Sequence, residues 1–406
     1  MAKKILILLL AILMFKTLIL SDFAGAQKAS PAKPLPDMFV WTSLATGSTG
    51  HSTSVGFGEA IRKITGVPVK IIPDPTDIGG WLPILTGKAS ACFRGAASSY
   101  ASSAGIGKVF GLPEWGPQRV RMIWQTPLIV GIATTKGTGI KTNADLKGKR
   151  IPDYRGWGSG RTDLNAVFAG FNIKRDEVIW VPTTGYVDGI KALGEGKVDV
   201  AFVAPDAALA KEVDVTTKGI VWLEGPKDPE AIKRWLQMAP YLVLFWWDIE
   251  GPGGLSPKNP IWSSGERYLV LSHEKLDPEL AYLMTKGIWE GYDIYKDMHP
   301  VLKRATHKEM LDYTVAIDPY HEGTIRYLKE VKVWTTEHER HQKEKLELEA
   351  QRMRAWEEAA EEAKKKGIKL NDPAWFDEEK GFCVEYLRGK GLIPLPEIKY
   401  HPYVKR

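Results

Sequence analysis

The sequence has little of several things, and each scarcity excludes a class of protein. Its 406 residues include two cysteines, Cys92 and Cys383, which excludes a disulfide framework, a CxxC motif and a tetrahedral metal cage. The net charge is only +6, which is too small for a nucleic-acid binder by charge alone. After residue 20 no apolar run is long enough to span a membrane. Tryptophan, by contrast, occurs 15 times, and the length is typical of about two domains.

The first 26 residues are typical of a secretory signal peptide. Lys3 and Lys4 precede an apolar run over 5–15, and Ala-Gly-Ala at 24–26 provides a small-x-small cleavage pattern. We therefore expect cleavage after Ala26 and export of the mature protein. The alternative is that the segment stays in place as a membrane anchor.

The body of the chain reads as two copies of one series of strands and helices. Related segments, GKASACF over 87–93 and GKVDVAF over 196–202, occupy corresponding places in the two copies. Strands that alternate with helices predict parallel α/β sheets, and two such lobes would leave a cleft between them. The predicted strands cover 39–45, 67–72, 89–93, 149–152, 178–181, 198–203 and 241–247, and the predicted helices cover 77–85, 163–171 and 187–193.

A glycine-rich loop follows the first strand of each copy. Open backbone N–H groups and a helix N-terminus favour an anion in such a loop, and an arginine side chain can bind a carboxylate with two hydrogen bonds. Arg94 follows a buried strand, so we expect it at the sheet edge where ligands bind in α/β proteins. The alternative is that the loops are ordinary turns with Ser and Thr helix caps. The candidate binding residues are Ser48, Thr49, Gly50, Arg94, Trp157, Gly158, Ser159, Gly160 and Arg161.

Five tryptophans, Trp41, Trp81, Trp157, Trp246 and Trp247, lie near predicted loops or strand ends that face the cleft. They could stack on an apolar or aromatic part of a ligand, or pack in the core. Because Trp157 lies inside a glycine-rich loop, it is the one that we expect to line the site.

Several short motifs, in their order along the chain, resemble those of the TAXI-type solute-binding subunits of TRAP transporters. The resemblance covers about residues 38–330. It implies an α/β, two-lobed periplasmic-binding-protein fold of type II, the Venus flytrap. The first lobe would combine 38–133 with 250–330, and the second would be 134–249. The motifs are ATGSTG over 45–50, IKTNADLKGKR over 140–150, GSGRTDLNA over 158–166, GKVDVAF over 196–202, LDPEL over 276–280, HP at 299–300 and HEG over 321–323.

The resemblance also implies a function. A receptor of this family captures a small solute, typically an amino acid such as glutamate or a related carboxylate, in the periplasm and delivers it to the membrane subunits of a TRAP permease. The family binds its solute with the Ser-Thr-Gly loop and the Gly-Ser-Gly loop, which correspond here to Ser48, Thr49, Gly158, Ser159 and Gly160. The sequence departs from the family at 51–53, at Arg94 and at Arg161. We hypothesise that Arg94 and Arg161 hold carboxylate groups of an anionic solute.

Residues 331–406 form a C-terminal extension outside the resemblance. The segment 337–366 is rich in alternating charges with a thin apolar seam, which predicts one long solvated helix. It could pack on the receptor's own surface, self-associate or contact a partner. From residue 370 onward we expect an irregular strap.

Patterns typical of enzymes are absent. There is no phosphate-binding GxxxxGK[ST] loop, no HExxH and no EF-hand, and Ser159 does not lie in a GxSxG elbow. We therefore expect no catalytic residue, no metal, no cofactor and no nucleic-acid partner. The alternatives are a hydrolase or transferase on the same fold, or a ligand-binding receptor for a signalling partner.

Overall fold

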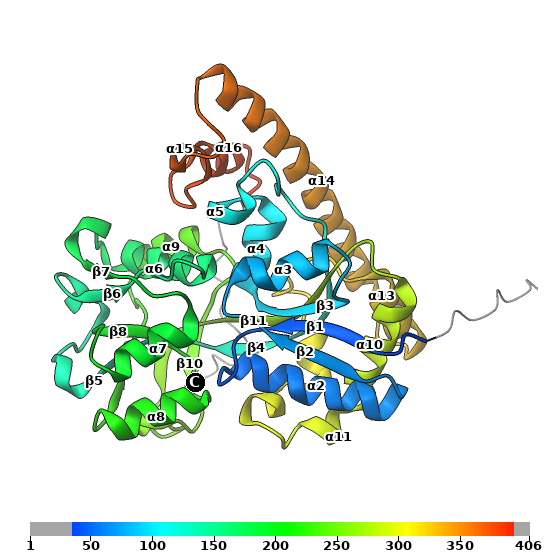
Figure 1. The fold of residues 1–406 in the computed structure, drawn as a ribbon, viewed down its shortest axis with the longest axis horizontal. Coiled ribbons are helices and arrows are strands. Elements are labelled where there is room, and N and C mark those ends of the chain that lie inside the picture. The colour runs from blue at the N-terminus through cyan, green and yellow to red at the C-terminus, as the bar shows by residue number, and fades with distance from the viewer. Residues whose placement is uncertain (1–34, 394–406) are drawn as a thin grey trace, which may run out of the picture. The chain divides into compact units, whose positions relative to one another are not determined.

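The computed structural model describes residues 35–393 (Figure 1). The predicted signal peptide lies outside the described residues, as do residues 394–406 of the C-terminal extension. By their contacts, residues 1–37 separate from a second unit that begins at Met38, and every helix and strand below belongs to this second unit. None of the described helices combines the length and the apolar composition that a membrane span requires.

The first lobe is built on a six-stranded sheet. Its strands are β1 (Phe39–Ser43), β2 (Val69–Pro73), β3 (Ala91–Gly95), β4 (Val120–Ile129), β10 (Val243–Trp247) and β11 (Ile261–His273). The order is β10-β11-β3-β1-β2, with β4 paired to β11. β1 runs parallel to β2 and β3, as the alternation of strands and helices predicts, whereas β11 is antiparallel to β3, β4 and β10.

Helices from both ends of the sequence cover this sheet. The longest early helix, α2, begins after Ser48, whose Oγ accepts a hydrogen bond from the N–H of His51, and it ends at Gly66, where φ is +78°. α2 packs against α10, which itself packs against α13 (Figure 1). The helices of this lobe are α2 (Thr49–Thr65), α3 (Asp77–Leu85), α4 (Ala96–Ala104), α5 (Gly107–Phe110), α10 (Pro278–Glu290), α11 (Tyr292–Tyr295), η5 (Pro300–Arg304), α12 (His307–Met310) and α13 (Glu322–Glu330).

The second lobe has smaller sheets. A three-stranded sheet has the order β8-β5-β9, and a parallel pair joins β6 and β7. The strands are β5 (Gly131–Thr135), β6 (Arg150–Pro152), β7 (Ile179–Val181), β8 (Val200–Val203) and β9 (Ile220–Trp222). The helices are η1 (Lys136–Thr138), η2 (Asn143–Leu146), α6 (Gly158–Phe171), η3 (Arg175–Glu177), α7 (Tyr186–Gly194), α8 (Ala208–Thr216), α9 (Pro229–Met238) and η4 (Pro252–Gly254).

The chain passes between the two sheets twice. Only Val130 separates β4 in the first sheet from β5 in the second, and the chain returns between β9 and β10. The predicted fold class, two α/β lobes of the type II periplasmic-binding-protein kind with a C-terminal helical extension, is confirmed. By sheet membership β5 belongs to the second lobe and β10 to the first. The lobe limits at residues 133 and 249 stay predictions.

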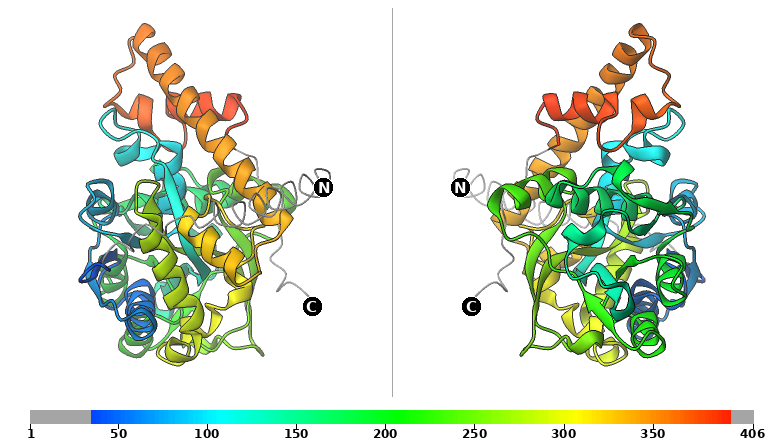
Figure 2. Two further views of the ribbon diagram at one scale, coloured as in Figure 1. Left: turned by 90° about the vertical axis from the view of Figure 1, so that its right-hand side faces the viewer. Right: turned by 90° about the vertical axis from the view of Figure 1, so that its left-hand side faces the viewer.

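Up to residue 393, the C-terminal extension forms one long helix and two short ones. α14 (Thr336–Lys365) confirms the long charged helix, and α15 (Pro373–Phe376) and α16 (Phe382–Gly389) fold back toward it (Figure 2). The expectation of an irregular strap from residue 370 is wrong for these two segments. Asp372 caps α15 by accepting a hydrogen bond from the N–H of Ala374 at 2.8 Å, and Pro373 begins the helix.

Candidate functional site

A cavity lies between the two lobes, beside the strands that join them. Its volume, including the part open to solvent, is about 400 Å³, and we call it the inner cavity. Both lobes and strands β4 and β11 contribute to its wall, so a small molecule inside would contact both lobes. The lining residues are Leu44, Asp77, Arg94, Gly95, Ser98, Leu128, Val130, Trp157, Ser159, Asp163, Tyr186, Glu266 and Tyr268.

Among the described residues that line the inner cavity, Arg94 alone carries positive charge. It lies on β3 and is 1% exposed. Its Nη2 donates to the carbonyl oxygen of Thr76 at 3.2 Å, whereas Nε and Nη1 have no hydrogen-bond partner within residues 35–393. Gly80 leaves space for this side chain, because a Cβ at Gly80 would lie 1.8 Å from Nη2. A buried guanidinium with unused donors is suited to an oxyanion.

Three carboxylates line the same cavity, and each comes from a different element. Asp77, at the start of α3, accepts hydrogen bonds from the N–H and the Oγ of Ser159 at 3.2 and 3.4 Å. Asp163, on α6, accepts from the hydroxyl of Tyr241 at 2.7 Å. Glu266, on β11, accepts from the backbone N–H of Ala97 at 2.8 Å. All three carboxyl groups are buried, and among the described lining residues they outnumber the one guanidinium.

Burial and the charge of neighbouring carboxylates raise the pKa of Asp163 and of Glu266. Burial raises the pKa of Asp163 to about 7, and the neighbouring carboxylates Glu378 and Asp77 add to this effect. Burial and the charge of Asp163 raise the pKa of Glu266 well above its usual range. A cation close to Asp163 or Glu266 would stabilise the ionised form of that carboxyl group.

The first glycine-rich loop lies at the contact between the lobes. Ser48 is the N-cap of α2, and the Oγ1 of Thr49 donates to the Oδ1 of Asp206 in the second lobe at 2.8 Å. Asp206 also forms an ion pair with Arg304. Gly50 allows close packing, because a Cβ there would lie 3.3 Å from the hydroxyl oxygen of Tyr268. None of the loop residues 48–50 lines the inner cavity.

The second glycine-rich loop borders the inner cavity. Trp157 and Ser159 line it directly, and the ring of Trp157 packs edge-on against Tyr154 and Tyr186. Gly160 lies against the same ring, since a Cβ there would be 2.1 Å from Cε3 of Trp157. The chain at 157–160 is thus folded tightly around one indole ring.

Each of the two loops meets a carboxylate from the opposite lobe. Asp206 of the second lobe accepts from Thr49, and Asp77 of the first lobe accepts from Ser159. The sequence predicts an external anion at both loops. In the structure the protein's own carboxylates occupy hydrogen-bonding positions there, and the unused donors belong to Arg94 instead.

A wider groove adjoins the inner cavity and shares Asp77, Ser98 and Ser159 with it. This outer groove has a volume of about 970 Å³, including the part open to solvent. Gly158 and Arg161 line it, so Arg161 lies in the groove and not in the inner cavity. The C-terminal extension reaches the groove as well, through Glu378, and burial raises the pKa of this carboxyl to about 7.

The other tryptophans singled out above are structural. Trp41 and Trp81 are fully buried in the first lobe, and Trp247 is 1% exposed. Trp246 is partly buried and packs against the ring of Trp262, with 5.6 Å between centroids. Of the five, only Trp157 lines the inner cavity.

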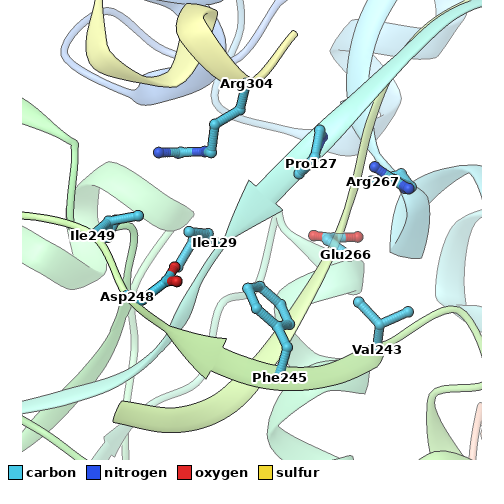
Figure 3. A pocket seen from close by; sticks show the side chains of 9 residues that line it. All are labelled: Pro127, Ile129, Val243, Phe245, Asp248, Ile249, Glu266, Arg267 and Arg304. Atoms are coloured by element: carbon cyan, nitrogen blue, oxygen red, sulfur yellow. The ribbon is translucent and has the colours of Figure 1, made fainter. Parts of the chain in front are cut away.

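A third cavity lies on the other face of the strands that join the lobes (Figure 3). Successive residues of β4 point to opposite faces, so Leu128 lines the inner cavity and Pro127 and Ile129 line this back cavity. Figure 3 shows Phe245 and Arg304 extending toward the space. Its lining is largely apolar, and its volume is about 580 Å³, including the part open to solvent.

The sequence did not single out several residues of the inner cavity. Asp77 and Asp163 begin two predicted helices, and Asp163 follows the second glycine-rich loop closely in the sequence, so only its position carried a signal. Glu266 and Tyr268 lie on β11, for which we predicted no strand. Glu378, which lines the outer groove, lies far from the loops in sequence.

Comparisons with known proteins identify a family. The model of the NMT1-like family matches residues 117–331. No curated protein matches the chain. Three solved structures illustrate the similar chains, each with low identity and a TM-score below 0.5. A protein from Bordetella bronchiseptica RB50 is 13% identical over 73% of this chain and 98% of its own, with a TM-score of 0.46.

The second is an ancestral arginine-binding protein bound to arginine, 15% identical over 65% of this chain and 97% of its own, with a TM-score of 0.40. The third is a binding-protein component of an ABC phosphonate transporter from Pseudomonas aeruginosa, 11% identical over 76% of this chain and 99% of its own, with a TM-score of 0.42. The match to the family model spans more than half of the sequence and includes strands of both lobes, and the chain therefore belongs to the NMT1-like family.

Proposed function

We propose that the protein is a solute-binding receptor of a membrane transporter, which captures a small molecule in the inner cavity. The observation that carries the proposal is Arg94, a guanidinium that is 1% exposed, lines an interlobe cavity and keeps two nitrogens without hydrogen-bond partners. A group of this kind is costly to bury unless an oxyanion completes it.

The architecture supports binding by closure of two lobes. Residues of both lobes line the inner cavity, and β4 of the first sheet continues into β5 of the second with only Val130 between them. Such an arrangement permits a hinge motion, and a solute that contacts both lobes would favour the closed form.

The location and the membrane partner are further parts of the proposal. The signal-peptide pattern of residues 1–26 supports export to the periplasm. The motif resemblance supports the membrane subunits of a TRAP permease as the partner and the TAXI type as the subfamily. Uptake into vesicles that contain such a permease should require the receptor, and unchanged uptake without it would contradict this partner.

A thermal-shift screen tests the receptor function. The exported chain would be heated with amino acids, keto acids, dicarboxylates, sulfonates and phosphonates at increasing concentration. A solute that binds only the folded state raises the unfolding midpoint as its concentration rises. We expect at least one solute with an anionic group to do so and to be recovered chemically unchanged.

Two results would contradict the proposal. Conversion of the solute into a product would favour an enzyme on this fold. The absence of any shift across the panel, with calorimetry agreeing, would remove the receptor function at the inner cavity.

A further inference from the structure

We infer that the C-terminal extension bridges the two lobes, and that its Glu378 is a positioning residue that holds α6 of the second lobe against the first lobe. The helices of the extension begin at Thr336, beyond the residues 117–331 that the family model matches. The inference goes beyond the proposed function, because it concerns how the lobes are held together and not which solute they bind. It can therefore be tested without a solute.

Two buried indole rings attach the extension to the first lobe. The Nε1 of Trp356 donates a hydrogen bond to the carbonyl oxygen of Gly105 at 2.8 Å, and the Nε1 of Trp375 donates to that of Gly111 at 2.6 Å. Both rings are buried. α14 also packs on α4, and α15 packs on α5 (Figure 1). We therefore expect the extension to move together with the first lobe.

The same extension contacts the second lobe at two points. Oε2 of Glu378, which lies between α15 and α16, accepts a hydrogen bond from Oγ1 of Thr162 on α6. Further along the chain, Nη2 of Arg388 on α16 donates to Sδ of Met238 at 3.9 Å, and Met238 is the last residue of α9. Because α6 and α9 pack against each other, both contacts restrain the same pair of helices.

The carboxyl group of Glu378 lies between the backbones of the two lobes. A Cβ at Gly107 of α5, in the first lobe, would lie 2.5 Å from Oε1 of Glu378. A Cβ at Gly158 of α6, in the second lobe, would lie 3.6 Å from the same oxygen. Since both neighbours are glycines, no side chain of theirs separates the carboxyl group from either helix. Glu378 therefore contributes to the spacing between α5 and α6.

The bridge lies next to the residues that line the inner cavity. α6 begins at Gly158, and its first turns carry Ser159 and Asp163, which line the cavity, with Thr162 between them. Glu378 itself lines the outer groove. Opening of the lobes would move α6 away from α5 and would break the hydrogen bond between Thr162 and Glu378. The bridge therefore favours the closed arrangement and keeps Ser159 close to the first lobe.

Distance measurements between two spin labels test the bridge in the full chain without a solute. Lys63→Cys on α2 and Val215→Cys on α8 place one label at an exposed site of each lobe, whereas the native Cys92 and Cys383 are buried. The labelled parent protein should show one main distance. In Glu378→Ala the lost hydrogen bond should raise the ratio of open to closed molecules at least about threefold, which adds a second, different distance.

Further variants assign the effect to this hydrogen bond. In Glu378→Gln the amide oxygen can still accept from Thr162, so the distances should match those of the parent protein. Thr162→Val removes the donor from the second lobe and should reproduce Glu378→Ala, and the double variant should open no further. Glu379→Ala changes an exposed neighbouring carboxylate and should leave the distances unchanged. Circular dichroism checks that each variant is folded.

Two results would overturn the inference. If Glu378→Ala and Thr162→Val keep the distance of the parent protein, the extension only covers the first lobe and does not restrain the second. If Glu379→Ala opens the lobes as far as Glu378→Ala, the contact with Thr162 is not the cause. Thr162→Val alone decides the matter if Glu378→Ala does not fold. The thermal-shift screen tests the receptor function separately, so either conclusion can fail while the other stands.

Discussion

At the scale of single residues, Arg94 lowers the stability of the protein, and in the proposed function the same side chain binds the solute. A buried guanidinium without an ion pair lowers the stability of the solute-free protein, because its desolvation is not compensated. The same unused donors give an incoming oxyanion charge-assisted hydrogen bonds. Stability and binding should therefore respond in opposite directions when this side chain is replaced.

The variant Arg94→Met tests this opposition. Hydrogen bonds to charged groups contribute about 1.5–3 kcal/mol, so the solute found in the screen should bind roughly 10- to 150-fold more weakly. The free energy of unfolding without solute should stay equal or rise. Calorimetry and urea unfolding measure the two quantities. Arg155→Met, at an exposed site, serves as the control, and a large loss of stability with intact binding would contradict the argument.

The raised pKa of Asp163 predicts how stability depends on pH. Between the ordinary carboxyl pKa of about 4 and the folded-state value of about 7, the folded protein binds a proton that the unfolded chain has released. The free energy of unfolding of the solute-free protein should therefore fall as the pH rises through this window, by at most about 1.4 kcal/mol per pH unit for one such group.

Urea unfolding at several pH values measures this slope. Asp163→Asn removes the titrating group, so its slope between pH 4 and 7 should be smaller than that of the parent protein. Asp188→Asn, at an exposed position, should leave the slope unchanged. Equal slopes for all three proteins would show that Asp163 titrates normally.

At the scale of elements, the sequence predicted the bounds of a helix or strand well where the signals for its start and end lie within the element itself. α3 has the predicted bounds of 77–85, and β10 lies inside the predicted 241–247. α6 begins five residues earlier than predicted, because the glycine-rich segment Gly158–Gly160 is itself helical. β11 carries Gly265, Glu266 and Arg267 in its middle, so its sequence does not alternate like that of a half-buried strand.

The attachment of the C-terminal extension should depend on Trp375. This side chain is fully buried, packs against Trp356 with 5.5 Å between centroids, and donates to Gly111. Trp375→Phe should cost about 1 kcal/mol for the lost hydrogen bond, and Trp375→Ala about 3–5 kcal/mol for the cavity.

Hydrogen exchange of the amides in α15 and α16 measures these losses locally. We expect faster exchange there in the order Ala, Phe, parent, with little change in the sheet of the second lobe. Unchanged exchange in Trp375→Ala would mean that the extension is held by other contacts, such as the ion pair of Arg121 with Glu349.

At the scale of the whole second unit, the geometry of the site depends on the contacts between the two lobes. Local sequence patterns could not predict these contacts. Ser159 and Trp157, which we singled out because their loop follows a strand, line the inner cavity. That Thr49 would bond to Asp206, and Ser159 to Asp77, depends on pairs separated by 157 and 82 residues. No periodicity within either segment carries that information.

The contact of Asp206 with Thr49 and Arg304 predicts a shift in lobe closure. Asp206→Asn removes the ion pair with Arg304 and should increase the radius of gyration of the solute-free protein. Small-angle scattering measures the change, and saturating solute should reverse it. Glu212→Gln, at an exposed site on α8, is the matched control. An unchanged radius would mean that this contact does not govern closure.

Asp77 and Asp206, each of which accepts a hydrogen bond from a loop of the opposite lobe, also affect how a transporter would distinguish a receptor with solute from one without. The hydrogen bonds of Asp77 and Asp206 join the two lobes without a solute. Part of the free energy that favours the closed form is therefore independent of the solute. A membrane partner that binds only the closed form would then also bind receptors without a solute, and such binding would transport nothing. Stronger contacts of Asp77 and Asp206 would therefore favour closure around the solute, and they would also increase the share of solute-free receptor that the membrane partner binds.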